Sequence, residues 1–255
     1  MLRMIPFMFL VISSLLVASD SPPHMHVLLV GDTVSKGREH RACARSDLFL
    51  MKEALKSIAR QIGSELKLTI LKDELYNRRQ ARKWLKSLPN SGKDIVVFFY
   101  TGHGFKDEGK TAWPILSFTN NAPLRGTSIV EFFRKHHQRL SLAIFNACNA
   151  GRRDLSPSWS PVNPIISSNN KLSGLGSLFL MARGNIVITA CSRGQTASAD
   201  PSGSPFVISL LEAMLKTCVH DTSWSVVLEN TKTLTRAHTS YNHYENPQEP
   251  FYTID

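Results

Sequence analysis

One histidine and one cysteine of this chain stand where nucleophilic catalysis needs them, each just after an apolar, strand-like run. His103 follows residues 95–100 and lies between two glycines, which let the backbone turn sharply and leave the imidazole accessible. Cys148 follows residues 140–145 and lies among small residues that leave its thiol open to a carbonyl group. A cysteine with a histidine in reach is the arrangement that generates a nucleophilic thiolate.

The elements that must position these two residues alternate along the chain. Short apolar runs predict strands over residues 26–31, 66–71, 94–100, 113–118, 140–145 and 185–190, with an edge strand from residue 249. Apolar residues at helical spacing predict helices over residues 47–62, 78–88, 128–137, 204–217 and 223–237. The order predicts an α/β fold, a three-layer sandwich with a mostly parallel central sheet flanked by helices. Because sites in such sheets lie at the carboxyl ends of the strands, we expect His103 and Cys148 to lie together.

Composition excludes several classes of protein. The 255 residues are 42% hydrophobic and 20% charged, which is enough for a packed core and rules out a disordered or collagen-like chain. Four cysteines are too few for a disulfide scaffold, and without a CxxC pair neither a zinc site nor a thioredoxin-like site is supported. The net charge of +10 is scattered, with clusters only at residues 78–83 and 152–153. We interpret these as solvated faces and expect no nucleic-acid partner.

The first residues resemble an export signal. A charged start precedes an apolar run over residues 5–17, and small residues follow it. Because this run is shorter than the bilayer core, we predict a signal peptide over residues 1–19, extending at most to about residue 23. The mature chain is then exported, secreted or periplasmic, with no stable membrane insertion; the alternative is an uncleaved N-terminal anchor.

The rest of the chain, residues 24–255, is predicted to form one domain. Residues 154–173 are rich in Ser, Pro and Asn and predict a long exposed loop, since the strand pattern resumes after it. Basic residues Arg152, Arg153 and Lys171 offer positions for self-cleavage in or beside this loop. The alternative is a tolerated surface insertion.

Five segments carry a resemblance to a known family. Residues 100–104 read YTGHG and residues 146–151 read NACNAG, similar to the Y-S-G-H-G and D-[AS]-C-H-S-G blocks of metacaspases. Residues 113–118, WPILSF, resemble the L-Y-P-V-D-F strand between those blocks. Residues 191–200 resemble the later C-x-D-D-Q-T-S-A-D segment, and residues 42–51 the early G-C-x-N-D-A-x-x-M helix start. The cysteine follows the histidine by 45 residues, near the spacing of about 50 in caspases.

The resemblance covers about residues 26–250 and implies a caspase-fold (caspase-haemoglobinase-like) cysteine endopeptidase that acts on protein or peptide substrates. It implies that Cys148 attacks the scissile carbonyl and that His103 transfers protons, with a thioester intermediate. The backbone N–H groups of Gly104 and Cys148 are the candidate oxyanion donors.

The resemblance to metacaspases implies cleavage after Arg or Lys, with the basic P1 side chain bound by acidic side chains of the enzyme. Asp47 matches one family acid, although its position also suits a helix N-cap or first turn. Asn146 stands where the family has a second acid, which weakens the expected cation site. Ser192 is the third candidate for the S1 pocket, which binds the P1 side chain.

Cofactors and assembly are predicted from the same resemblance. The family's two acids before Gln195 are replaced by Arg193 and Gly194, so we expect no metal site and no calcium requirement. We expect a monomer. Oxidative pairing of Cys148 with Cys191 is one route to inactivation, and the states of Cys43 and Cys218 stay open.

Three rival functions remain. A caspase-fold module that has lost catalysis is favoured by the altered Asn146 and Arg193. A legumain-like peptidase would instead prefer Asn or Asp at P1. A basic nucleic-acid binder is disfavoured by the scattered charge.

Overall fold

The computed structural model describes residues 22–119, 122–136, 138–151, 174–217, 219–240 and 248–255. The predicted signal peptide and the loop over residues 154–173 lie outside these ranges, as do Arg152, Arg153 and Cys218.

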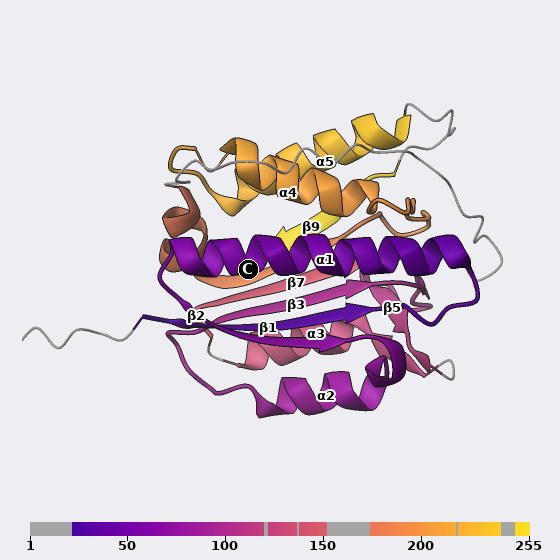
Figure 1. Ribbon diagram of the computed structural model, residues 1–255, viewed down its shortest axis with the longest axis horizontal. Helices are drawn as coiled ribbons and strands as arrows, with labels where there is room; N and C mark the ends of the chain where they lie inside the picture. The colour runs from indigo at the N-terminus through magenta and orange to yellow at the C-terminus, as the bar shows by residue number, and fades with distance from the viewer. Residues whose placement is uncertain (1–21, 120–121, 137, 152–173, 218, 241–247) are drawn as a thin grey trace, which may run out of the picture.

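A six-stranded sheet forms the centre of the molecule (Figure 1). Its spatial order is β2 (Glu65–Leu71), β1 (His24–Gly31), β3 (Ile95–Thr101), β7 (Leu140–Asn146), β8 (Gly184–Thr189) and β9 (Phe251–Ile254). All neighbouring pairs are parallel except the antiparallel edge strand β9. The mostly parallel sheet and the C-terminal edge strand are therefore confirmed.

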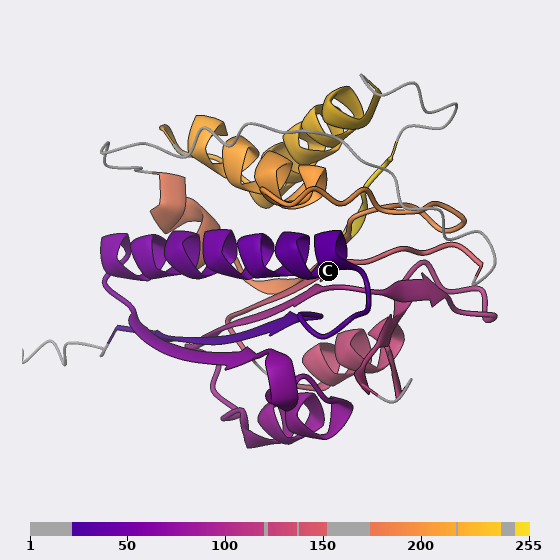
Figure 2. The same cartoon turned by 45° about the vertical axis from the view of Figure 1, so that its right-hand side comes forward.

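Helices cover both faces of this sheet, as Figures 1 and 2 show. One face carries α1 (Arg38–Gln61), the π-helix Gly176–Met181, α4 (Pro205–Thr217) and α5 (Trp224–Ser240). The other face carries α2 (Arg78–Ser87) and α3 (Gly126–Lys135), and a 3₁₀ turn, Asp73–Leu75, precedes α2. This arrangement is the predicted three-layer sandwich.

Strand β3 shows why the apolar runs are continuous. Alternate side chains of a strand point to opposite faces of the sheet. Residues 95, 97 and 99 pack into the core beneath α1, while residues 96, 98 and 100 pack into the core beneath α2. All six are fully buried because helices cover both faces.

Two parts of the fold differ from the expectation. Helix α1 begins at Arg38, earlier than the predicted residue 47, since its first turns are mostly polar and carry little apolar periodicity. The strand predicted over residues 113–118 is β5 (Pro114–Ser117), and it belongs to a separate antiparallel sheet with β4 (Gly104–Lys106) and β6 (Pro123–Arg125). Three-residue strands such as β4 and β6 are too short for a periodic signal.

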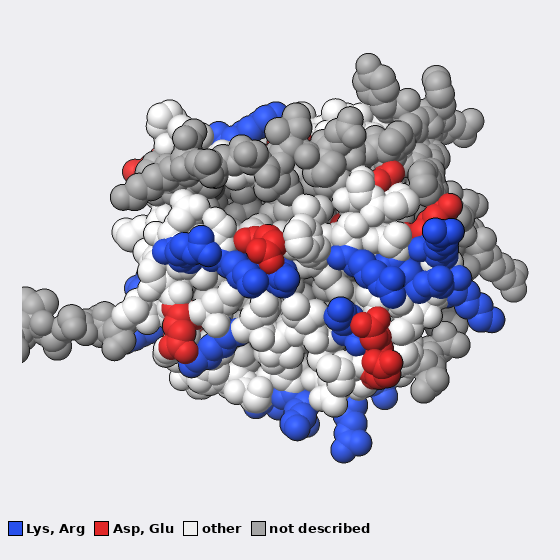
Figure 3. All heavy atoms as spheres, in the orientation of Figure 1, with Lys and Arg blue, Asp and Glu red and all other residues white. Residues whose placement is uncertain are grey.

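The surface carries many basic side chains, as expected from the positive net charge of the chain. Figure 3 shows Lys and Arg side chains in separate groups over α1 and along the lower edge, with Asp and Glu side chains between some of them. Among the residues that the structure describes, none of the helices is both long and apolar enough to span a membrane.

Candidate active site

His103 and Cys148 are delivered by adjacent parallel strands. Strands β3 and β7 pair along their full length, with Thr101 opposite Asn146 at their carboxyl ends. The Gly102 N–H donates a hydrogen bond to the Asn146 carbonyl at 3.1 Å, which ties the two following loops together. His103 and Cys148 then line one narrow pocket of about 50 Å³. The sequence expectation that the two strand ends meet is confirmed.

The backbone at His103 is held by buried tyrosines. The Tyr100 hydroxyl donates to the His103 carbonyl at 2.7 Å, and the Ser117 N–H donates to the same oxygen at 3.0 Å. Tyr76 donates to the Ser117 carbonyl and lies 2.8 Å from the Tyr100 hydroxyl. Burial raises the pKa of Tyr100 far above its ordinary value, so this hydroxyl stays a neutral donor.

Replacing Tyr100 with phenylalanine is therefore expected to destabilise the protein by about 1 kcal/mol, because the His103 carbonyl loses one of its two donors. Urea unfolding measures this change. Tyr252→Phe is the matched control: its hydroxyl bonds to the exposed Glu229, so we expect a change within about 0.5 kcal/mol. Equal effects of the two substitutions would show that the Tyr100 hydroxyl does not support the loop.

Gly104 brings the histidine loop against the cysteine loop. A Cβ atom at Gly104 would lie 2.7 Å from the Ala147 Cβ and 2.8 Å from the Cys148 carbonyl oxygen. Only glycine permits this approach. The two candidate oxyanion donors, Gly104 and Cys148, therefore lie side by side on neighbouring backbones.

The Cys148 thiol contacts the loop that follows β8. The Ala197 N–H donates to the Cys148 sulfur at 3.4 Å, and the Ala197 carbonyl lies 3.9 Å from it. Burial raises the pKa of Cys148, and the backbone hydrogen bonds oppose this effect only in part. The free thiol is therefore protonated at neutral pH, and a base must remove its proton before it can act as a nucleophile.

Asp47 lies directly behind the pocket wall. Its carboxylate is fully buried and accepts hydrogen bonds from the Thr101 hydroxyl at 2.7 Å and the Ser204 N–H at 2.8 Å. Cys43, on the same helix, donates its thiol hydrogen at 3.7 Å. Burial raises the pKa of Asp47 from 3.8 to about 6. The alternative that Asp47 caps a helix is wrong, since it lies in the middle of α1, whose N-cap is Gly37.

Asn146 completes the group around Asp47. Its side-chain nitrogen lies 2.8 Å from the Asp47 carboxylate, 3.0 Å from the Thr101 hydroxyl and 2.9 Å from the Ser204 hydroxyl. Its side-chain oxygen is buried and has no hydrogen-bond partner among the described residues. Because Asn146, Thr101 and Cys43 all line the pocket, the three of them separate Asp47 from it.

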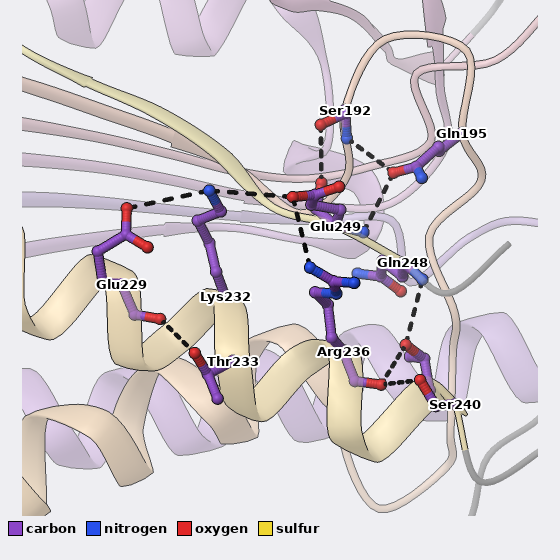
Figure 4. A network of polar contacts seen from close by, with 10 residues as sticks. Ser192, Gln195, Glu229, Lys232, Thr233, Arg236, Ser240, Gln248 and Glu249 are labelled. Atoms are coloured by element: carbon purple, nitrogen blue, oxygen red, sulfur yellow. Dashed lines mark hydrogen bonds and ion pairs between the residues drawn. The ribbon is translucent and has the colours of Figure 1, made fainter.

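Ser192 lies in a different network. Its hydroxyl donates to the Glu249 carbonyl at 3.0 Å, and its N–H donates to the same oxygen at 2.7 Å (Figure 4). The Gln195 side-chain oxygen accepts from the N–H groups of Ser192 and Glu249. Ser192 is not among the residues that line the pocket. It instead anchors the loop that places Ala197 against Cys148.

The described cysteines are free thiols. Cys191 is fully buried, with its sulfur 3.4 Å from the Ala147 carbonyl and 3.3 Å from the Gln195 carbonyl. Burial and the nearby Cys148 raise its pKa well above the ordinary value. Cys191 is therefore a protonated hydrogen-bond donor that holds the two loops together.

Two pocket residues were not singled out from the sequence. His40, in the first turn of α1, places its ring centroid 4.9 Å from that of His103. It was missed because the helix was predicted to begin only at residue 47. Asp32 directly follows β1 and lines the same pocket, so the carboxyl-end rule that located His103 also applies to it.

Metal ligands are not grouped at this site. Within the described ranges, no three His, Cys, Asp or Glu side chains are arranged to hold a metal ion. His24 and His26, near the described N-terminus, pair with Glu65 and Asp94 instead.

Comparison with known proteins agrees with the fold. A family model described as Caspase domain matches residues 25–253, almost the whole described chain. Caspase-1 from Spodoptera frugiperda has a similar structure, with a TM-score of 0.58 and 10% sequence identity over 92% of this chain and 88% of that chain. At this identity the structural likeness shows the fold alone. No curated protein matches the sequence. The family match shows that this chain belongs to the caspase-fold cysteine peptidases.

Proposed function

We propose that this protein is a metacaspase-like cysteine endopeptidase with a Cys148/His103 dyad. The observation that carries the proposal is the convergence of these two residues on one pocket, from the carboxyl ends of adjacent strands. Asn146 lines that pocket and Asp47 lies behind its wall. These two side chains are the groups that would recognise the P1 side chain.

The chemistry proceeds in two displacement steps. His103 accepts the Cys148 thiol proton, and the thiolate attacks the scissile carbonyl carbon, whose oxygen becomes an oxyanion facing the backbone N–H groups of Gly104 and Cys148. The oxyanion collapses, the carbon–nitrogen bond breaks, and His103 gives its proton to the leaving amine. Water then attacks the thioester, His103 accepts the water proton, and the acid product leaves as Cys148 regains a proton.

A basic P1 residue fits the hydrogen-bonding character of the pocket. Asp32 lines it, the Asp47 carboxylate lies behind its wall, and the Asn146 side-chain oxygen lacks a partner among the described residues. All three are acceptors, whereas guanidinium and ammonium groups are donors only. We therefore propose cleavage after Arg or Lys.

The preference for a basic P1 residue is expected to fall at acidic pH. Asp47 is charged above a pKa of about 6 and neutral below it, and only the charged form attracts a P1 cation. The measurement is kcat/KM for a P1 Lys peptide divided by that for its P1 Gln counterpart, from pH 5 to pH 8. The division cancels the titration of the dyad, which acts on both peptides. We expect the ratio to rise about tenfold across pH 6; a constant ratio would remove Asp47 from P1 recognition.

A panel of fluorogenic peptides with Arg, Lys, Asn or Asp at P1 tests the function itself. The reduced protein is assayed with calcium and with a chelator, and we expect cleavage after Arg or Lys in both. Cleavage only after Asn or Asp would indicate the legumain-like alternative. A folded, reduced protein that cleaves none of the peptides would favour a binding module.

A further inference from the structure

We propose that His40 is a positioning residue for His103, a neutral imidazole ring that rests against the catalytic one and lets it take up the Cys148 proton. The inference rests on the proposed dyad and adds a second histidine to it. His40 reaches the pocket from the first turn of α1, on a different element from either dyad residue.

The rings of His40 and His103 lie close together, and the backbone at Gly37 leaves room for this arrangement. Their ring centroids are 4.9 Å apart, and the ring planes are tilted by 40°. Gly37, the N-cap residue of α1, leaves the space that the His40 ring occupies, since a Cβ atom there would lie 2.8 Å from His40 Nδ1. The ring is half-buried between this turn and His103, which limits the directions in which either ring can swing.

The charges around His40 keep it neutral near pH 7. Burial lowers its pKa, and the neighbouring His103 lowers it further, while Asp32 and Glu39 oppose the shift without cancelling it. Asp32 directly follows β1, Glu39 lies on α1 and His103 follows β3, so these charges reach the ring from three separate elements.

The consequence concerns the proton that His103 receives. Two imidazolium rings 4.9 Å apart repel each other, so His103 accepts the Cys148 proton readily only while His40 is neutral. Protonation of His40 at acidic pH therefore suppresses the active state of the dyad. A second inactivating proton is then expected in the acid limb of the activity profile, in addition to the proton of the dyad itself.

The test uses variants that distinguish the packing of the His40 ring from its protonation. His40→Phe keeps an aromatic ring but cannot be protonated, and His40→Ala removes the ring. We expect log kcat/KM of the wild type to fall at acidic pH with a slope approaching two, and that of His40→Phe with a slope of one. We expect kcat of His40→Ala to fall about tenfold with little change in KM, because His103 is less well oriented. Gly37→Ala should lower kcat in the same direction, by displacing the His40 ring without removing it.

A second readout does not depend on activity. In NMR titrations, the pKa of His40 is expected to lie below its ordinary value and to move to higher pH in His103→Phe, since a repelling neighbour has been removed. His220→Phe is the matched control, because His220 is exposed in the segment between α4 and α5, and it should change neither readout. An unchanged slope in His40→Phe together with an unchanged His40 midpoint in His103→Phe would overturn the inference while leaving the dyad intact. A wild type without peptidase activity would contradict the proposed function, and the His40 midpoint would still decide whether the two rings interact.

Discussion

Replacing Cys148 with alanine is expected to lower kcat/KM for peptide cleavage by at least about 10⁴-fold. The other thiol that lines the pocket, Cys43, is buried, has a pKa raised well above its ordinary value and donates to Asp47, so it does not replace Cys148 as the nucleophile. The substitution removes one partly buried sulfur atom, whose contacts are with the Ala197 backbone. The fold should therefore survive, with Tm within a few degrees of the wild type. Activity is measured on the P1 Arg peptide under reducing conditions, and folding by circular dichroism.

Cys191→Ala is the matched control for this experiment. Cys191 follows the neighbouring strand β8 and is a free thiol, but its sulfur contacts backbone carbonyls rather than the pocket. We expect it to keep kcat/KM within about tenfold of the wild type. If Cys148→Ala retained more than one hundredth of the activity, or if Cys191→Ala lost as much, Cys148 would not be the nucleophile.

Converting Asn146 to aspartate is expected to destabilise the protein by about 3–5 kcal/mol at pH 8. The side-chain nitrogen of Asn146 lies 2.8 Å from the fully buried Asp47 carboxylate, so the substitution places two carboxylates in contact. The other hydrogen-bond partners of Asp47 are neutral groups, which cannot offset the added charge.

The loss of stability should depend on pH in a defined direction. The pKa of Asp47 is already raised to about 6, and a second carboxylate beside it raises one of the two values further. A group with a raised pKa in the folded protein binds its proton more tightly there than in the unfolded chain. The variant is therefore least destabilised below pH 5, where the pair shares a proton, and loses stability as the pH rises through 6 and above.

Urea unfolding at pH 5 and pH 8 measures this effect. Asn77→Asp is the control: Asn77 caps α2 by accepting from the Gln80 N–H, and aspartate serves that position equally well. We expect its unfolding free energy to stay within about 0.5 kcal/mol of the wild type at both pH values. A loss for Asn146→Asp of the same size at pH 5 and pH 8 would mean that the two carboxylates do not interact.

The positions of His103 and Cys148 could be predicted because the signals that place them are local. A continuous apolar run marks a strand buried on both faces, and the residues directly after such a run lie at the carboxyl end of the sheet. Two such runs, over β3 and β7, predict that the two dyad residues lie together, and the strands are indeed neighbours. The same rule applied to β1 points to Asp32.

Other parts of the site depend on contacts between distant segments. Ser204 lies 157 residues from Asp47 in the chain, yet its N–H completes the carboxylate's hydrogen bonds. Ser192 follows a strand end, as the dyad residues do, but its bonds to Glu249 direct it away from the pocket. His40 contacts His103 only because α1 begins nine residues before its apolar periodicity becomes visible.

The sequence alone therefore determined the order of the main strands and helices along the chain, the three-layer sandwich and the two residues of the proposed dyad. Apolar periodicity and the direction of parallel strands specify all of these. Only the tertiary structure decided that Asp47 lies behind the pocket wall rather than at a helix end, and that His40 joins His103. Hydrogen bonding and ring contact between separate elements depend on the packing of the whole domain, which no local pattern encodes.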